Sequence, residues 1–537
     1  MPAHMVRTLL ALCIGCSTCD RAVEDPVGAD SEPVLVDAVW SEVSFPAAPG
    51  SMGASLTATD GGLLATWIEP IERGHRVRFA RFDGSWGDVY TVVEGEALIA
   101  NWADFPRSAL GGDGAVYVHH LHRAGEAAYA YEIRLSRMRE DAFESLGVVH
   151  RDGTPTEHGF VSMVPTPDGV RLFWLDGRAT VRDGATQVFT AEVNETIGEA
   201  QPIDERVCDC CQTDAVMTPG GPLVAFRDRS DSEIRDIAFS RWDGAAFSAP
   251  RSVHDDGWEI AGCPVNGPQL SVHGESTVVA WFTGARGGVV HVAFDEGDAF
   301  GTPIEVDARQ PPGRVDVAAL DDGAAVSWLA RGRDSGEVRV RFVGRDGRLG
   351  APTRVGTASV ERDSGFPVMA RWREHLYVGH RAGDAVRLAR LAIAALPRAP
   401  GEPDEELAAR VEVGAECPVA RVETEEGVAD LAERGPRVVA FYARWCQPCR
   451  EELRMLERLR EELPILAVSV DEGTLERATG VARGWGFEGE VARDGGAASI
   501  LGVPPLPGTF VIGADGKLRL VAAGRLTNAD ELRAALR

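Results

Sequence analysis

The chain has 537 residues, which is too long for a single hydrophobic core, so we expect at least two domains. Its 82 acidic and 55 basic residues give a formal net charge of −27, which argues against nucleic acid and against an anionic membrane surface as partners. Sixty glycines and 12 tryptophans favour a β protein rich in turns over a helical one.

The first twenty residues have the pattern of an export signal. A basic start at residues 5–7 is followed at residues 8–15 by an apolar run too short to span a bilayer. The run ends in Gly15-Cys16, and a small residue directly before a cysteine resembles the lipobox of bacterial lipoproteins. The resemblance implies lipidation at Cys16; ordinary cleavage, a cytosolic amino terminus and lipidation at Cys19 are the alternatives. Residues 1–20 are therefore predicted to be a signal, and the acidic residues 21–33 a tether.

A repeat occupies residues 34–395, where short alternating apolar runs are separated by Gly and Asp turns. One apolar run in each repeat ends in an aromatic residue or a histidine: Trp67, His120, Trp174, Phe226, Trp281, Trp328 and His380. The steps between these anchors are 53, 54, 52, 55, 47 and 52 residues. A period near 50 built from short strands is typical of a β-propeller. Six and seven blades both remain open, because the first and last repeats can combine.

Turns such as Asp83-Gly84-Ser85-Trp86 resemble a worn form of the turn in sialidase-type (BNR) propellers, although the full motif is absent. A working sialidase needs three arginines, a Tyr/Glu nucleophile pair and an Asp acid. Arginines are available, but Tyr377 is the only tyrosine late in the propeller and no Glu partner is apparent. A sialidase-like hydrolase therefore stays as the alternative to a binding scaffold.

A Pro- and Glu-rich linker at residues 396–404 separates the propeller from a region, residues 405–537, in which strands and helices alternate. The pattern predicts strands at 437–443 and 465–470, helices at 448–463, 475–484 and 528–537, and a hairpin from 509–512 and 518–522. The predicted fold class is therefore multidomain, an all-β propeller followed by an α/β domain.

Cys446 and Cys449 lie where the predicted strand at 437–443 gives way to a helix. At a helix amino terminus, unpaired N–H groups and the helix dipole favour a thiolate. Pro448 suits the first turn, since its missing N–H is not needed there. Cys449 follows one turn later, close enough to attack a mixed disulfide formed on Cys446.

Residues 441–449, Glu452 and residues 507–517 resemble the TlpA-like thioredoxin family of membrane-tethered, extracytoplasmic thiol–disulfide oxidoreductases. The resemblance implies a thioredoxin fold and a redox-active Cys446–Cys449 disulfide, in which Cys446 is the nucleophile and Cys449 resolves. It also assigns Trp445 and Pro448 to the active-site motif and Pro507 to a cis-proline that faces the disulfide. Protein disulfides as substrates, a membrane dithiol donor upstream, no cofactor and a periplasm-facing location follow from the same resemblance.

Two residues depart from the family pattern. Ala440 occupies the place of a buried Asp, so proton transfer to Cys449 is assigned to Glu452 or to water, and Arg454 replaces a proline of the active-site helix. A structural disulfide and half of a zinc site are the alternatives for this cysteine pair. Ala443 stands where peroxiredoxins carry a Thr, which argues against that activity.

Four cysteines are the least ordinary residues of the propeller: Cys208, Cys210, Cys211 and Cys263. Cys208 and Cys263 each precede a repeat anchor by 18 residues, so they hold equivalent positions at the start of the innermost strand in neighbouring repeats. His158 precedes its own inner strand similarly. The polar residues that follow the second strand of each repeat are expected on the same face: His122, Arg178, Arg227, Asp228, Arg229, Arg286 and Arg331.

Three interpretations of this cysteine cluster remain open. Export favours structural disulfides between blades, of which a Cys208–Cys263 bridge is the simplest. The four cysteines, assisted by His158, are also candidate ligands for copper(I) or zinc. A redox pair that exchanges with Cys446 is the third interpretation. Cys19 and Cys417 are left over from the two clusters.

Overall fold

The structure is a computed structural model. It describes residues 38, 40–285, 287–332, 335–361, 364–399, 413–431, 435–444, 446–470, 474–495, 497, 501, 506–523, 526 and 529–536. The predicted signal and tether, Cys16, Cys19, Trp445 and Arg286 lie outside these residues. No helix among the described residues combines the length and the apolar character needed to cross a membrane.

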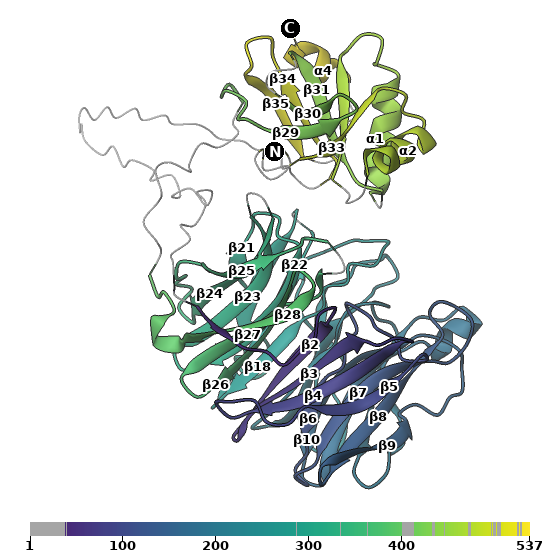
Figure 1. Ribbon diagram of the computed structural model, residues 1–537, viewed down its shortest axis with the longest axis vertical. Coiled ribbons are helices and arrows are strands. Elements are labelled where there is room, and N and C mark those ends of the chain that lie inside the picture. Colours follow the sequence, from purple (N-terminus) through teal and green to yellow (C-terminus); the bar gives the residue numbers. More distant parts are fainter. Residues whose placement is uncertain are drawn as a thin grey trace, which may run out of the picture.

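The first part of the chain forms seven antiparallel sheets of four strands each, which Figure 1 shows as separate blades. Blades 1 to 3, each given from its first strand to its last, are β2 (Met52–Thr59), β3 (Gly62–Pro70), β4 (His75–Phe82) and β5 (Tyr90–Gly95); β6 (Ser108–Leu110), β7 (Val116–Arg123), β8 (Tyr131–Arg139) and β9 (Ala142–Val148); β10 (His158–Thr166), β11 (Gly169–Asp176), β12 (Gln187–Val193) and β13 (Gln201–Asp204).

Blades 4 to 7 follow the same plan. They are β14 (Asp214–Thr218), β15 (Gly221–Arg227), β16 (Ile237–Arg241) and β17 (Arg251–His254); β18 (Gln269–His273), β19 (Ser276–Thr283), β20 (Val289–Phe294) and β21 (Ile304–Asp307); β22 (Gly313–Leu320), β23 (Gly323–Arg331), β24 (Gly336–Gly344) and β25 (Thr353–Ala358); β26 (Val368–Trp372), β27 (His375–Ala382), β28 (Ala385–Ala392) and β1 (Ser41–Val43). This part also contains the 3₁₀ turns Arg178–Arg182 and Ile393–Ala395.

The first strands of the blades contact one another in a closed ring, from β2 through β6, β10, β14, β18, β22 and β26 back to β2. They are therefore the innermost strands, and the fold is a seven-bladed β-propeller. The last blade is completed by β1, which pairs antiparallel with β28. Sequence periodicity left six and seven blades open because this short closing strand lies some 350 residues before its partner.

The repeat anchors sit on the second strand of every blade, where both faces of the strand are covered by neighbouring blades. Four of them, Trp67, Trp174, Trp281 and Trp328, are fully buried. A buried indole N–H needs an acceptor, and each of the four donates to a carboxylate: Glu69, Asp176, Asp256 and Asp307, respectively. The repeated aromatic residue is therefore a packing and hydrogen-bonding unit of the blade.

The second part of the chain is a mixed seven-stranded sheet with helices. Its elements are β29 (Arg421–Thr424), β30 (Gly427–Asp430), β31 (Arg437–Tyr442), α1 (Gln447–Glu457), β32 (Ile465–Ser469), α2 (Leu475–Gly484), β33 (Glu490–Asp494), β34 (Gly508–Ile512), β35 (Leu518–Ala523) and α4 (Ala529–Leu536). The strand order is β30-β29-β33-β32-β31-β34-β35, with β31 parallel to β32 and antiparallel to β34. This is a thioredoxin-like arrangement, in which β31 lies inside the sheet between β32 and β34.

Two features of this second part differ from the sequence prediction. Helix α1 ends at Glu457 instead of residue 463. After Glu457 the chain forms tighter turns, in which Leu459 N donates a hydrogen bond to Leu456 O, and Pro464 then disfavours a helical conformation in the residue before it. Strands β29, β30 and β33 were not predicted. At the end of the propeller, Ala351 N still donates to Ala399 O, so the chain stays hydrogen-bonded to blade 6 into the predicted linker.

Candidate functional site

The Cys446–Cys449 pair lies at the junction of β31 and α1. Cys446 is the N-cap of the helix, and the two cysteines are joined by a disulfide with their Cα atoms 5.3 Å apart. The backbone N–H of Cys449 donates to Cys446 Sγ at 3.2 Å. Pro448 occupies the first turn, where a missing N–H costs nothing. The amino end of α1 is thus directed at the sulfur of Cys446, the arrangement that stabilises a thiolate.

Both cysteines of this pair are almost fully buried, with exposed fractions of 3% for Cys446 and 1% for Cys449. They belong to an apolar cluster that includes Tyr442 and Leu453. The Leu506–Pro507 peptide bond, which leads into β34, is cis, as the sequence analysis expected. Arg454, which the sequence analysis singled out in the helix, donates from Nε to Trp485 O at 3.2 Å.

Glu452 is a buried carboxyl group one helical turn after Cys449. The hydroxyl of Thr509 donates to its Oε1, and Leu526 N donates to its Oε2 at 3.1 Å. Burial raises the pKa of Glu452, and these hydrogen bonds only partly offset the effect. Ala440, the strand residue that stands in place of a buried Asp, pairs with Thr509 across β31 and β34. Thr509 is also the residue whose hydroxyl donates a hydrogen bond to Glu452.

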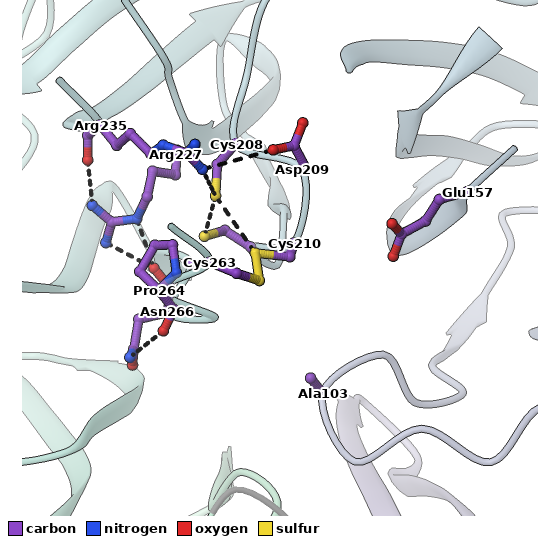
Figure 2. Close-up of a disulfide and its surroundings, with 12 residues drawn as sticks. Ala103, Glu157, Cys208, Asp209, Cys210, Arg227, Arg235, Cys263, Pro264 and Asn266 are labelled. Carbon is purple, nitrogen blue, oxygen red and sulfur yellow. Dashed lines mark hydrogen bonds and ion pairs between the residues drawn. A yellow bond between two sulfur atoms is a disulfide. The ribbon is translucent and has the colours of Figure 1, made fainter. Parts of the chain in front are cut away.

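The propeller cysteines lie in the loops that lead into β14 and β18, the innermost strands of blades 4 and 5, as their spacing predicted. The predicted Cys208–Cys263 bridge is wrong: the disulfide joins Cys210 and Cys263 (Figure 2). Cys208 N donates to Arg227 O at 2.9 Å, and Cys208 is fully buried, whereas Cys263 is exposed. Cys208 and Cys211 keep their thiols, with the Sγ atoms 2.6 Å apart.

Cys208 and Cys211 have the spacing of a second CxxC motif, which the sequence analysis overlooked. The same spacing that singled out Cys446 and Cys449 would have identified it. The motif was obscured by Cys210, which stands between the two cysteines and belongs to the disulfide with Cys263.

His158 does not lie with the cysteines. Its Nε2 is 3.3 Å from Asp152 Oδ2 and 3.4 Å from Asp176 Oδ1, and its ring stacks on His150 with 3.5 Å between centroids. Among the described residues, two separate groups have metal-ligating spacing: Cys208 with Cys210 and Cys211, and His150 with Asp152 and His158. The predicted assistance of His158 to the cysteines is therefore not supported by the geometry.

Arg227 serves the propeller structure. It is 1% exposed, and its guanidinium donates to the main-chain oxygens of Asn266, Phe282 and Arg235 at 2.6–2.9 Å. The guanidinium also lies over the ring of Trp258. All three nitrogens of Arg227 are thus used within the protein.

The tyrosine that the sequence analysis considered, Tyr377, is buried against Phe82 of blade 1 and Trp372 of the last blade. The structure instead forms a Tyr/Glu pair that the sequence did not reveal, in which Tyr131 donates to Glu157. Burial raises the pKa of Glu157 to about 7. The two residues are 26 positions apart, on β8 and in the loop before β10, so no local motif marks them.

Comparisons with known proteins match the two parts separately. The sequence model of the AhpC/TSA family matches residues 414–521. The thiol-disulfide oxidoreductase ResA of Geobacillus thermodenitrificans is 32% identical over 96 residues, which cover 17% of this chain and 55% of the relative. ResA of Geobacillus kaustophilus is 30% identical over the same shares. The chain therefore spans about half the length of the curated relatives it matches.

Two solved structures illustrate the matches. A thio-disulfide isomerase from Thermus thermophilus has a TM-score of 0.21 and 26% identity, and the match covers 23% of this chain and 94% of that one. The NanB sialidase from Streptococcus pneumoniae has a TM-score of 0.36 and 10% identity, covering 64% of this chain and 69% of that one. Residues 414–521 form a thioredoxin-like domain that matches the AhpC/TSA family, and a seven-bladed β-propeller precedes it in the chain.

Proposed function

We propose that the protein is a thiol–disulfide oxidoreductase in which Cys446 is the nucleophile and Cys449 resolves. The observation that carries the proposal is the position of Cys446 at the N-cap of α1, bonded to Cys449. In the reduced protein, the Cys446 thiolate attacks a protein disulfide, and one substrate sulfur leaves as a thiolate. Cys449 then attacks Cys446 Sγ, which releases the substrate as a dithiol and leaves the Cys446–Cys449 disulfide.

Cys449 has to lose its proton before it attacks. Glu452 is the buried carboxyl group one turn away on the same helix, and Ala440 offers no carboxyl group from the strand. We assign proton acceptance to Glu452, directly or through a water molecule. Peroxide reduction is disfavoured by Ala443, since it removes the hydroxyl group that a peroxidatic cysteine uses.

The proposal is tested by titrating the full-length chain with reduced and oxidised dithiothreitol, quenching in acid, alkylating and digesting with trypsin. Cleavage after Arg444 and Arg450 isolates Cys446 and Cys449 in one peptide, separate from every other cysteine. We expect one reversible two-electron couple with a potential of about −250 mV or below, which is the range of a reductant. A potential above about −150 mV would identify an oxidant, and the absence of a reversible couple would reduce the pair to a structural bridge.

An exported, lipid-anchored location is part of the proposal, and so is an upstream membrane dithiol donor that re-reduces Cys446–Cys449. The location rests on the sequence pattern that ends in Cys16. Trypsin is expected to yield an amino-terminal peptide, residues 16–21, that carries a diacylglycerol on Cys16. Mass spectrometry of the membrane fraction checks this. A lipidated peptide that begins at Cys19 would move the anchor to that residue, and an amino-terminal peptide without a lipid would contradict lipid anchoring.

The propeller is proposed to bind a partner or to carry a second cysteine site. The alternative, a sialidase-like hydrolase, gains some support from the Tyr131–Glu157 pair. However, Arg227 has no nitrogen left for a sugar carboxylate, and the guanidinium of Arg178 is bound to Asp176 at 2.6 Å. These contacts weigh against the hydrolase.

A further inference from the structure

The four cysteines of the propeller form one contiguous group of sulfur atoms. Cys208 Sγ lies 2.6 Å from Cys211 Sγ and 4.0 Å from Cys210 Sγ, and Cys210 is bonded to Cys263. Cys208 and Cys211 are thus two free thiols in direct contact with each other. A dithiol and a disulfide therefore share one site (Figure 2).

Cys208 has the surroundings of a nucleophile. Arg235 donates from Nη1 to Cys208 Sγ at 3.5 Å, and Figure 2 shows Arg227 on the same side. Burial raises the pKa of Cys208, but the Cys211 thiol, the backbone N–H of Cys210 and the two guanidinium groups outweigh burial and lower it. In Cys211, burial and the neighbouring Cys208 raise the pKa. Of the two thiols, Cys208 is therefore the one that loses its proton more easily.

The two ends of the group differ in exposure. Cys208 and Cys211 have exposed fractions of 0% and 1%, whereas Cys263 is exposed to solvent. Cys210 lies between them, with an exposed fraction of 9%. A reagent or a partner from outside therefore reaches the Cys263 end, while the dithiol is enclosed.

We propose that this group is a disulfide relay that exchanges a surface disulfide for a buried one. The Cys208 thiolate attacks Cys210 Sγ, the Cys210–Cys263 bond breaks, and Cys263 leaves as a thiolate. Cys211, after passing its proton to Cys263, attacks Cys208 Sγ and forms the Cys208–Cys211 bond, and Cys210 leaves as a thiolate that takes up a proton from water. The proton that Cys208 had released to water balances that uptake.

The net reaction converts one disulfide and two thiols into another disulfide and two thiols, and it needs no external oxidant or reductant. As a consequence, the reducing equivalents of the buried dithiol are transferred to the thiols of Cys210 and Cys263, of which Cys263 is exposed. There they are available to the disulfide of a partner protein. The relay lies entirely in the propeller, so it does not rest on the activity proposed for Cys446.

The Cys211→Ser variant isolates the first step. It is made in a chain that also carries Cys417→Ser, Cys446→Ser and Cys449→Ser, so that the second domain supplies no thiol. With three propeller cysteines left, only one bond can form among them. Iodoacetamide added under native conditions is expected to capture Cys263 as it leaves and to convert the chains to a Cys208–Cys210 bond. After trypsin, the disulfide-linked pair of peptides 207–227 and 252–286 should disappear.

The matched control is Cys208→Ser in the same background, which keeps Cys211 but removes the attacking thiolate. We expect Cys263 to be alkylated at least tenfold more slowly there, and the rate in Cys211→Ser to be independent of protein concentration. Equal rates in the two variants, or a linked peptide pair that persists in Cys211→Ser, would overturn the relay.

If Cys211→Ser does not fold by circular dichroism, Cys208→Ser is compared with a chain that keeps all four propeller cysteines. Both chains are treated with dithiothreitol until each contains one disulfide among its propeller cysteines. The four-cysteine chain should then yield alkylated Cys210 and Cys263 together with a Cys208–Cys211 bond. Alkylation confined to Cys208 and Cys211 would exclude the exchange.

Discussion

Replacing Cys446 with serine is expected to lower the rate of protein disulfide reduction by on the order of a thousandfold or more. The hydroxyl group of serine is not ionised near neutral pH, so the amino end of α1 has no thiolate to stabilise and no mixed disulfide forms. The rate is measured with insulin as the disulfide substrate and dithiothreitol as the reductant. Cys449→Ser is expected to behave differently, because Cys446 still attacks but nothing resolves the product. A covalent insulin adduct should accumulate on non-reducing gels and disappear on reduction.

Cys417→Ser provides the matched control for these variants. Cys417 is buried in the same domain, and burial raises its pKa to about 11, so it carries no thiolate near neutral pH. The variant should keep the wild-type rate. Comparable losses in Cys417→Ser and Cys446→Ser would show that the domain is merely sensitive to cysteine removal. An adduct formed by Cys446→Ser instead of Cys449→Ser would reverse the assigned roles.

The propeller was predictable from sequence because its repeat is local. In two of the blades the tryptophan and its acceptor even lie on the same strand, two residues apart: Trp67 with Glu69 and Trp174 with Asp176. The short closing strand β1 was not predictable, since Ser41 pairs with Arg390 and has no repeat of its own. Blade number therefore depended on a contact between the two ends of the propeller.

The cysteine chemistry was predictable in part for the same reason. The spacing of Cys446 and Cys449 at a strand-to-helix junction is a local signal, and the structure joins the two cysteines in a disulfide at that junction. In the propeller, the spacing of the cysteines predicted the loops in which they lie but not which two of them form the disulfide. Cys208 N donates a hydrogen bond to Arg227 O on β15, and this contact keeps Cys208 in the interior. The disulfide with Cys263 is therefore formed by Cys210. Such an orientation depends on tertiary contacts.

Long-range polar contacts account for the remaining misses. The sequence analysis named Glu452 as a proton acceptor but not Thr509, which donates a hydrogen bond to Glu452 and lies 57 residues away in the chain. Tyr131 and Glu157 meet only because blades 2 and 3 are neighbours. The strands β30 and β33 are only four and five residues long, so their alternation is too short to distinguish them from loops.

The buried ion cluster around His158 suggests the second large effect, a loss of stability that depends on pH. Burial alone would lower the pKa of His158, but the close ion-pair contacts with Asp152 and Asp176 outweigh burial and raise the pKa to about 9. Arg178 completes the cluster with a 2.6 Å contact to Asp176. Two cationic side chains thus already neutralise the carboxylates that a metal ion would use, and His158 acts as an imidazolium.

His158→Gln is expected to reduce the free energy of unfolding by roughly 3 kcal/mol at pH 6, which is the difference between the folded pKa and the ordinary histidine value of about 6.5 expressed as free energy. Because the folded pKa is the higher one, this stabilisation is complete below about pH 6.5 and is lost as the pH rises through 9. Urea unfolding of the full-length chain, followed by tryptophan fluorescence, measures it, since ten of the 12 tryptophans precede residue 400.

His273→Gln is the control for this experiment. His273 pairs with Asp321 at 2.9 Å, but both side chains are exposed, 39% and 79%, so its removal should cost less than about 1 kcal/mol at any pH. A loss in His158→Gln that is the same at pH 6 and pH 10 would mean that His158 is packed as a neutral ring. It would then again be a candidate metal ligand, together with His150 and Asp152. A loss that fades with rising pH assigns the cluster to the stability of blade 3 and leaves the cysteines as the chemically active group of the propeller.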